Sequence, residues 1–241
     1  MTPIDLSKIG VNKQIKKITK WEIPRDSTGA LLLTMPNIPE PLYRLAPRNL
    51  YGEEAWKNIR QSCLKTARYK CEACGMQLWP REPQVHELYS YNYFEGIAIF
   101  QRCVCLCDTC HKGVHSGHTV SEYLRGNISK SRLLEIVENL FSIISDHNNS
   151  HKNIEPLRVY KSFMRCLNIP DLHNEFLALL EKYKIDFYAE DRRCMADQRT
   201  WQLLALGSTF LPCSKELLAR EWAIERAEQK LIYQPSYAKE A

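Results

Sequence analysis

Two Cys-x-x-Cys pairs, Cys71 with Cys74 and Cys107 with Cys110, restrict the fold of this chain more than any other feature. A Cys-x-x-Cys turn points both sulfurs at a common centre, and two such turns complete a tetrahedral zinc site with Zn–S distances of about 2.3 Å. The 32 residues between Cys74 and Cys107 exceed the usual gap of roughly 15–20 residues, so an element is inserted between the pairs. We expect one structural Zn²⁺ to join the two ends of that insert.

Histidines gather around this motif. His111 and His115 follow the second pair directly, and a helix that begins near Cys110 places them one turn apart on one face. His86 and Glu87 lie inside the insert, in an alternating run that is typical of one strand of a hairpin. Paired helical imidazoles can hold a divalent cation. Because phosphodiester hydrolysis needs a metal and a base that deprotonates water, the pattern predicts a nuclease site.

In these residues the chain resembles the HNH, or ββα-metal, endonuclease family, in its zinc-stapled branch. Cys71-x-x-Cys74-Gly75 and Leu106-Cys107-x-x-Cys110-His111-x-x-x-His115 match the pattern of that family term by term, and the resemblance covers residues 41–125. The catalytic pair of the family is represented by His86-Glu87. Arg102 stands where the family has an asparagine, with Gln101 beside it.

The resemblance implies roles for four residues. His86, His111 and His115 are expected to bind a catalytic divalent metal, with Glu87 as general base, so that His86, Glu87 and His111 are the expected catalytic residues. The reverse assignment, with His86 as base and Glu87 as ligand, is equally compatible with the sequence. Mg²⁺, Mn²⁺, Ni²⁺ and Zn²⁺ are all candidates, although three imidazoles favour the last three ions.

The remaining thiols and aromatic rings are interpreted as structural. Free cysteine is among the most buried residue types, so buried thiols are expected at the other six cysteines, with Cys103 and Cys105 as alternative soft ligands. Tyr89, Tyr91 and Tyr93 alternate on one strand face, where packing is a commoner role than base stacking. His118 is expected at the surface near the metal, beyond a helix that ends at Gly117.

Positive charge is concentrated before the zinc motif. The net charge is +5, and residues 1–70 carry 13 Lys and Arg against 6 Asp and Glu, whereas the remainder carries 20 against 22. A basic arm that follows DNA phosphates is the functional interpretation, and a solvated charge run is the structural alternative. The residues expected to contact DNA are Lys13, Lys16, Lys17 and Lys20.

The expected location is cytoplasmic. The N-terminus lacks the apolar region of a secretory signal, and no apolar run approaches the ~18–20 residues of a membrane span, so no membrane partner is expected. Small free-standing HNH proteins are often encoded by phages or mobile elements. By analogy with that family, the same origin is expected for this chain.

Composition shifts divide the chain into four segments: a basic, proline-punctuated arm (1–45), the HNH-like module (46–125), an amphipathic helix and linker (126–150), and a helical C-terminal domain of unknown role (151–241). Expected local elements are a short strand at 31–33, helices at 53–69, 155–167, 171–183 and from Ser214, and a linker at 146–150. The last segment offers helices through which the chain could bind a protein partner or form a homo-oligomer.

The sequence therefore predicts an α+β protein, with a ββα-metal (HNH) module, a structural zinc knuckle and a mostly helical C-terminal domain. The expected activity is metal-dependent hydrolysis of DNA phosphodiester bonds. The alternatives are a zinc-stapled protein that binds nucleic acid without cleaving it, and a structural zinc knuckle that supports a protein–protein role of the helical part.

Overall fold

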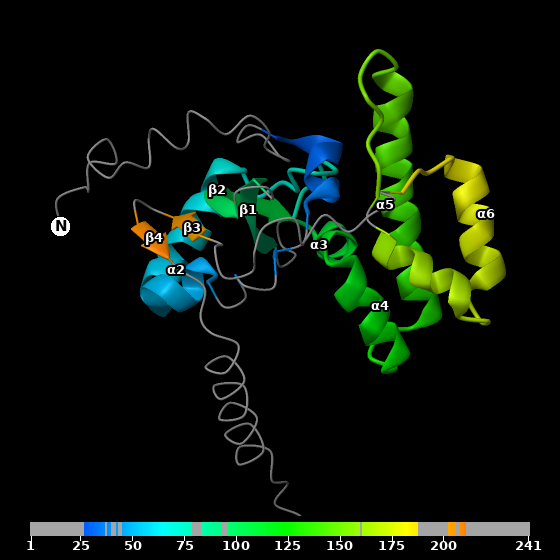
Figure 1. Ribbon diagram of the computed structural model, residues 1–241, viewed down its shortest axis with the longest axis horizontal. Helices are drawn as coiled ribbons and strands as arrows, with labels where there is room; N and C mark the ends of the chain where they lie inside the picture. Colours follow the sequence, from blue (N-terminus) through cyan, green and yellow to red (C-terminus); the bar gives the residue numbers. More distant parts are fainter. Residues whose placement is uncertain are drawn as a thin grey trace, which may run out of the picture.

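The computed structural model describes residues 27–36, 38–39, 42, 45–78, 83–92, 96–159, 161–187, 202–205 and 208–210. Strands lie at one end of the molecule together with α2, and α4 to α6 lie at the other end, with α3 between them (Figure 1). In chain order the elements are η1 (Gly29–Thr34), α2 (Pro47–Thr66), β1 (Gln84–Asn92), β2 (Ile97–Leu106), α3 (Asp108–Val114), α4 (Ser116–Leu124), α5 (Lys130–Ser150), η3 (Lys161–Asn168), α6 (His173–Tyr183), β3 (Gln202–Ala205) and β4 (Ser208–Phe210).

The described sheet has the strand order β1-β2-β3-β4, so β1 is an edge strand. β1 and β2 form the predicted antiparallel hairpin, with His86 opposite Val104 and Glu87 opposite Cys103. Because successive strand residues point to opposite faces, His86 and Glu87 lie on different faces of the hairpin. β3 pairs in parallel with β2, so part of the predicted C-terminal domain joins the N-terminal sheet.

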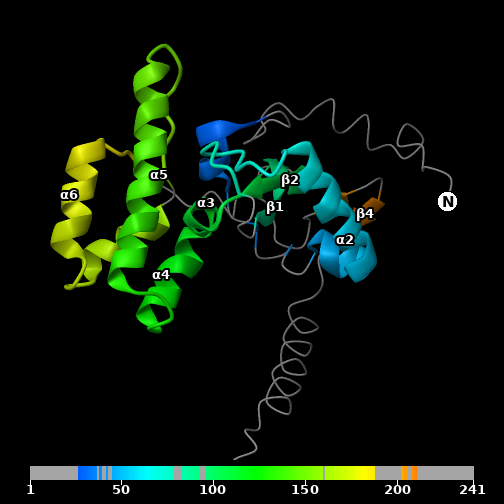
Figure 2. The same ribbon diagram turned by 180° about the vertical axis from the view of Figure 1, so that it is seen from behind.

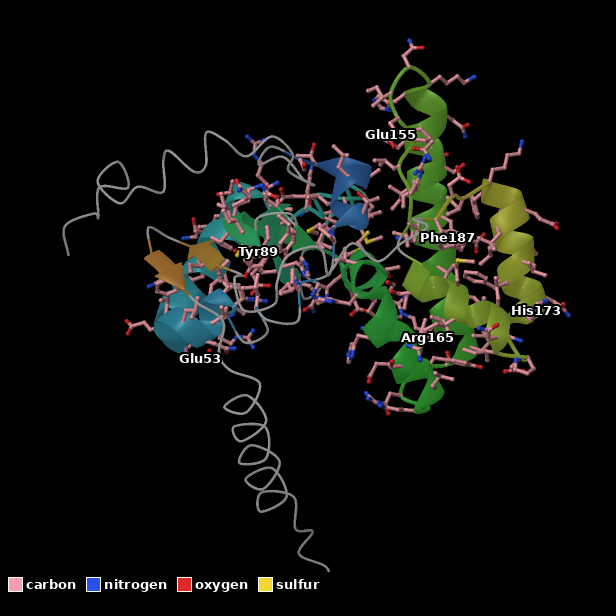
Figure 3. The ribbon with its side chains drawn as sticks, in the orientation of Figure 1. Glu53, Tyr89, Glu155, Arg165, His173 and Phe187 are labelled. Carbon is pink, nitrogen blue, oxygen red and sulfur yellow. The ribbon has the colours of Figure 1, made fainter. Side chains whose placement is uncertain are left out.

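The face of the hairpin that carries Glu87 is covered by α2 and by the segment before it. Tyr89 and Tyr91 are buried there in a small cluster with Leu42, Ala98 and Leu203, and Figure 3 shows Tyr89 within this region. The prediction that these two rings pack in the core is confirmed, while Tyr93 lies outside the described residues. α2 begins earlier than the predicted residue 53, with a kink at Gly52, whose φ of 81° suits glycine.

The opposite side of the hairpin joins the larger core. The apolar stripe of α5 is buried as predicted, through Leu133, Ile136, Val137, Leu140, Phe141 and Ile144. It packs against α3, α6 and η1, and one continuous core extends from η1 to Ile185. Figure 2 shows α5 between α6 and α3 from the other side of the molecule. The helical layer therefore supports the helix that carries His111.

Two local predictions, the linker at 146–150 and the strand at 31–33, were wrong. The expected linker at 146–150 is the last part of α5, and Asn148 anchors it because its amide exchanges two hydrogen bonds with the backbone of Leu157, at 3.0 and 2.8 Å. The expected strand at 31–33 lies within η1, where the Thr34 hydroxyl donates to the Leu31 carbonyl at 2.9 Å and stabilises a turn.

Predictions for the later helices have mixed outcomes. The helix predicted at 155–167 is shorter and tighter, because residues 155–158 form no regular element and Val159 bridges to Phe187 before η3 begins. α6 confirms the helix predicted at 171–183. The helix predicted from Ser214 lies outside the described residues, as do Lys13, Lys16, Lys17 and Lys20 of the basic arm. Among the described helices, none has both the length and the apolar character that crossing a membrane requires.

Candidate metal centres

The four motif cysteines converge on one point. One ligand atom from each of Cys71, Cys74, Cys107 and Cys110 lies within 4.8 Å of the others, and the Cys74 and Cys107 sulfurs are 3.9 Å apart. A tetrahedral site with Zn–S distances of about 2.3 Å requires sulfurs about 3.8 Å apart. The spacing and the all-sulfur donor set therefore fit a structural Zn²⁺.

Each pair is held by its own local backbone. The first pair follows α2 in a tight loop in which Gly75, with φ of 75°, donates its N–H to the Cys71 carbonyl at 2.8 Å. The second pair forms the junction of β2 and α3, where the Cys107 sulfur caps the helix by accepting the Cys110 N–H at 3.3 Å. The predicted helix start near Cys110 is thus two residues earlier, at Asp108.

Glu72 and Arg102 brace the two halves of the cysteine site. The Glu72 carboxylate accepts the Cys105 N–H at 2.8 Å and the Arg102 guanidinium at 2.7 Å. Arg102 also donates to the Ser27 carbonyl at 2.9 Å. Arg102 therefore holds the first cysteine pair and the preceding segment against β2.

The crowding of four thiols changes their acidity. Hydrogen bonds from the Cys107, Cys110 and Cys74 thiols hold the pKa of Cys71 far below its usual range. Hydrogen bonds from Cys107 and Cys110 lower the pKa of Cys74 to about 7. Such hydrogen bonds within the group favour the thiolate form, which is the form that binds a metal.

Cys103 and Cys105 belong to neither candidate metal group of the described residues. Both thiols are buried, and burial is the largest cause of their raised pKa values, to about 11 for Cys105. A thiol whose pKa is raised is a poor metal ligand. The structure favours the interpretation of both as packing residues.

Three histidines form a second group. His86 from β1, His111 from α3 and His115 from the α3–α4 junction each offer a ring nitrogen, and these atoms lie within 4.8 Å of one another. Their ring centroids are 4.7 to 5.4 Å apart in edge-on arrangements. We call these residues the histidine triad.

The triad is prepared to act as a set of neutral ligands. Burial is the largest cause of the lowered pKa of all three rings, and repulsion between the neighbouring imidazoles adds to it. The pKa of His111 falls from 6.5 to about 4. At neutral pH the rings are therefore uncharged, with lone pairs available for a metal.

A cavity of about 340 Å³ opens beside the triad. Its wall includes Gln84 from β1, Lys112 from α3, and His118 and Glu122 from α4. His118 is exposed at the surface as predicted, but the helix does not end at Gly117. The chain turns instead at His115, and α4 starts at Ser116.

Glu87 is separated from the triad by the strand itself. It is half-buried on the α2 side, where burial raises the pKa of its carboxyl and the charge of Arg48 opposes this shift. Its carboxylate is not part of the group formed by the three histidines. The structure therefore brings His86, and not Glu87, together with the helical histidines.

The sequence interpretation missed the charged network at the rim of the cavity. Asp108 accepts hydrogen bonds from Lys112 and from Arg132 of α5, the latter at 2.7 Å. The i, i+4 spacing of Asp108 and Lys112 was a usable signal. The link to Arg132 joins different helices and leaves no such pattern. Glu72 and Arg102 are likewise far apart in sequence.

Comparison of the chain with protein-family models, with curated proteins and with solved structures finds no match. Functional inference therefore depends on the two candidate metal groups and on the elements that position them.

Proposed function

We propose that this protein is a metal-dependent endonuclease that hydrolyses DNA phosphodiester bonds through an HNH-type site built from β1, β2 and α3. The observation that carries the proposal is the convergence of three histidines from the hairpin, α3 and the α3–α4 junction, beside the cysteine group whose second pair lies where β2 meets α3. A purely structural zinc knuckle does not require three further imidazoles within 4.8 Å of one another.

The two groups have different roles in this proposal. The four cysteines hold a structural Zn²⁺, since a closed all-thiolate site leaves no position for substrate. His86, His111 and His115 hold a second divalent metal, for which Mn²⁺, Ni²⁺ and Zn²⁺ suit imidazole better than Mg²⁺ does. When bound, that metal supplies positive charge to the phosphate and to the leaving oxygen.

The edge position of β1 offers a route by which Glu87 acts as the base. A phosphate that lies along an edge strand can meet side chains from both faces of the sheet, here His86 on one side and Glu87 on the other. Burial raises the pKa of Glu87, which brings this carboxylate closer to the proton affinity that a base needs at neutral pH. Arg48, exposed on the Glu87 side, adds positive charge for the phosphate backbone.

DNA is the proposed substrate because of the charge distribution. The surplus of positive charge lies in residues 1–70, and Lys13, Lys16, Lys17 and Lys20 are proposed to contact phosphates. These four lysines lie outside the described residues, so their role stays a prediction.

Nicking of supercoiled plasmid DNA tests the proposal. The zinc-loaded wild-type chain should convert supercoiled to relaxed DNA with at least one of Mn²⁺, Ni²⁺, Zn²⁺ or Mg²⁺. The variants His111→Ala and His115→Ala should remain folded with their cysteine-bound zinc, and lose about 10²–10⁴-fold in rate. His173 begins α6, at the end of the molecule away from β1 (Figures 1 and 3), and it does not belong to the triad, so His173→Ala serves as the matched control.

Two other outcomes have clear meanings. Absence of nicking by the wild-type chain with all four metals, while it still binds DNA, would favour the non-cleaving zinc-stapled protein. Cleavage that persists in Glu87→Gln but not in His86→Ala would remove Glu87 from the mechanism and leave the triad in place.

A further inference from the structure

The four sulfurs of the cysteine group differ in the origin of their hydrogen-bond donors. Cys71 accepts the backbone N–H of Cys74, and Cys74 accepts that of Met76. Cys107 accepts the N–H of Cys110 at 3.3 Å. These three donors belong to the same short turns as the cysteines that they serve.

The Cys110 sulfur receives its hydrogen bond from a different source, because Cys110 lies inside α3. The next backbone amide, His111 N–H, is committed to the Cys107 carbonyl at 2.9 Å, and the amides that follow point along the helix axis to earlier carbonyls. The Cys110 sulfur instead has a side-chain donor, Asn139 Nδ2 of α5, at 3.6 Å. This donor lies 29 residues away in the sequence.

The packing of α5 on α3 fixes this contact. Arg132, two helical turns before Asn139 on the same side of α5, bonds to Asp108 at 2.7 Å and to Thr109 at 2.9 Å. One residue after Asn139, Leu140 packs against Gly113, where a Cβ would lie in ordinary van der Waals contact with a Leu140 methyl, at 3.6 Å. Asn139 therefore lies between a polar contact, made by Arg132, and an apolar contact, made by Leu140, and both contacts join α5 to α3.

The hydrogen bond from Asn139 to Cys110 matters because a zinc-filled site would carry negative charge. Four thiolates around one Zn²⁺ carry a net charge of −2 in a largely buried position, and N–H donors aimed at the sulfurs offset it. Hydrogen bonds to ionised acceptors are about twice as strong as neutral ones. Loss of the donor to Cys110 therefore weakens the site for Zn²⁺ directly.

We propose that Asn139 is an outer positioning residue of the zinc site, and that through its bond to Cys110 the helical layer of α5 and the bound Zn²⁺ stabilise each other. By reciprocity, a residue on α5 that strengthens zinc binding also makes the docking of α5 dependent on zinc. This inference concerns the cysteine group alone and does not depend on whether the chain cleaves DNA.

Zinc affinity of side-chain variants tests the proposal. Asn139→Leu removes the donor, and Asn139→Asp keeps the shape but places a carboxylate against a thiolate. Competition with a chromophoric chelator for Zn²⁺ should show an affinity about 10–100-fold lower for Asn139→Leu, and a larger loss for Asn139→Asp. Asn149→Asp introduces the same charge change at an exposed position of the same helix and should bind Zn²⁺ like the wild type.

A measurement on the wild-type chain covers the case in which a variant does not fold. With ¹¹³Cd²⁺ in place of Zn²⁺, NMR should detect a scalar coupling between the metal and the side-chain amide protons of Asn139, transmitted across the N–H···S bond. Unchanged zinc affinity in both Asn139 variants, or absence of that coupling in the cadmium-loaded protein, would overturn the proposal.

Discussion

Removal of the Glu72 carboxylate should release the first zinc knuckle from β2. In the structure this side chain is 18% exposed and receives two hydrogen bonds, from the Cys105 N–H and from Arg102, whose side chain is 28% exposed. A hydrogen bond to a charged group contributes about 1.5–3 kcal/mol. Since both partners retain some contact with water, we expect Glu72→Ala to lower the free energy of unfolding by about 2–4 kcal/mol.

Urea unfolding at a fixed free Zn²⁺ concentration measures this loss, because zinc binding contributes to the stability of the folded state. A double-mutant cycle with Arg102→Met should give a coupling of about 1–2 kcal/mol between the two side chains. Glu155, exposed and 4.0 Å from Arg158 (Figure 3), provides the control, and Glu155→Ala should change stability by less than about 0.5 kcal/mol. A Glu72→Ala variant as stable as the control, or a coupling near zero, would refute the bracing role.

Three further predictions concern the histidine triad, the cysteine group and the basic arm. The pKa of His111 is about 4 in the folded chain against an ordinary 6.5, and those of His86 and His115 are also lowered. The unfolded chain therefore binds more protons between pH 6.5 and 4, and the free energy of unfolding should fall as the pH decreases through this window. Thermal unfolding of His111→Asn should show a shallower decline, and an equal decline would exclude His111 as a contributor. Cys107→Ser should lose most of its zinc and most of its soluble yield, because structural zinc contributes on the order of 10 kcal/mol to small modules; a folded, zinc-free variant would contradict the staple. Deletion of residues 1–20 should weaken DNA binding and flatten the dependence of log K on log salt, and an unchanged slope would assign the arm a role in solubility alone.

Local spacing identified the residues of the two candidate metal groups, because most of these residues come from short motifs. Two Cys-x-x-Cys turns and the His-x-x-x-His step fix relative positions within one turn of chain, and the hairpin only has to bring His86 back to them. The apolar stripe of α5 was equally accessible, since its period of three and four residues is a property of the helix alone.

Contacts between distant segments could not be predicted in this way. The donors to the cysteine site, Arg102 for Glu72 and Asn139 for Cys110, are 30 and 29 residues from their acceptors, and no local period connects them. The pairing of β3 with β2 also joins residues 202–204 to 97–99. Polar composition misled the linker prediction at 146–150, because Asn148 serves there as an anchor to Leu157 and does not end the helix.

The separation of His86 and Glu87 has a simpler cause. Adjacent residues of a regular strand point to opposite faces, so only one of the two side chains can lie on the face that α3 covers. The sequence left open which of the two binds the metal and which is the base, whereas the structure places only His86 beside His111 and His115 and puts Glu87 on the other face of the strand.

In the proposed function, phosphodiester cleavage depends on a metal held by the histidine triad. Mn²⁺ can be titrated into the zinc-loaded protein, with bound Mn²⁺ counted by electron paramagnetic resonance and nicking of supercoiled DNA measured in the same samples. We predict that the nicking rate rises in proportion to one Mn²⁺ bound per chain, and that His115→Ala shows neither the binding nor the cleavage. Full occupancy of this site without cleavage, or cleavage by His115→Ala without bound Mn²⁺, would contradict the claim.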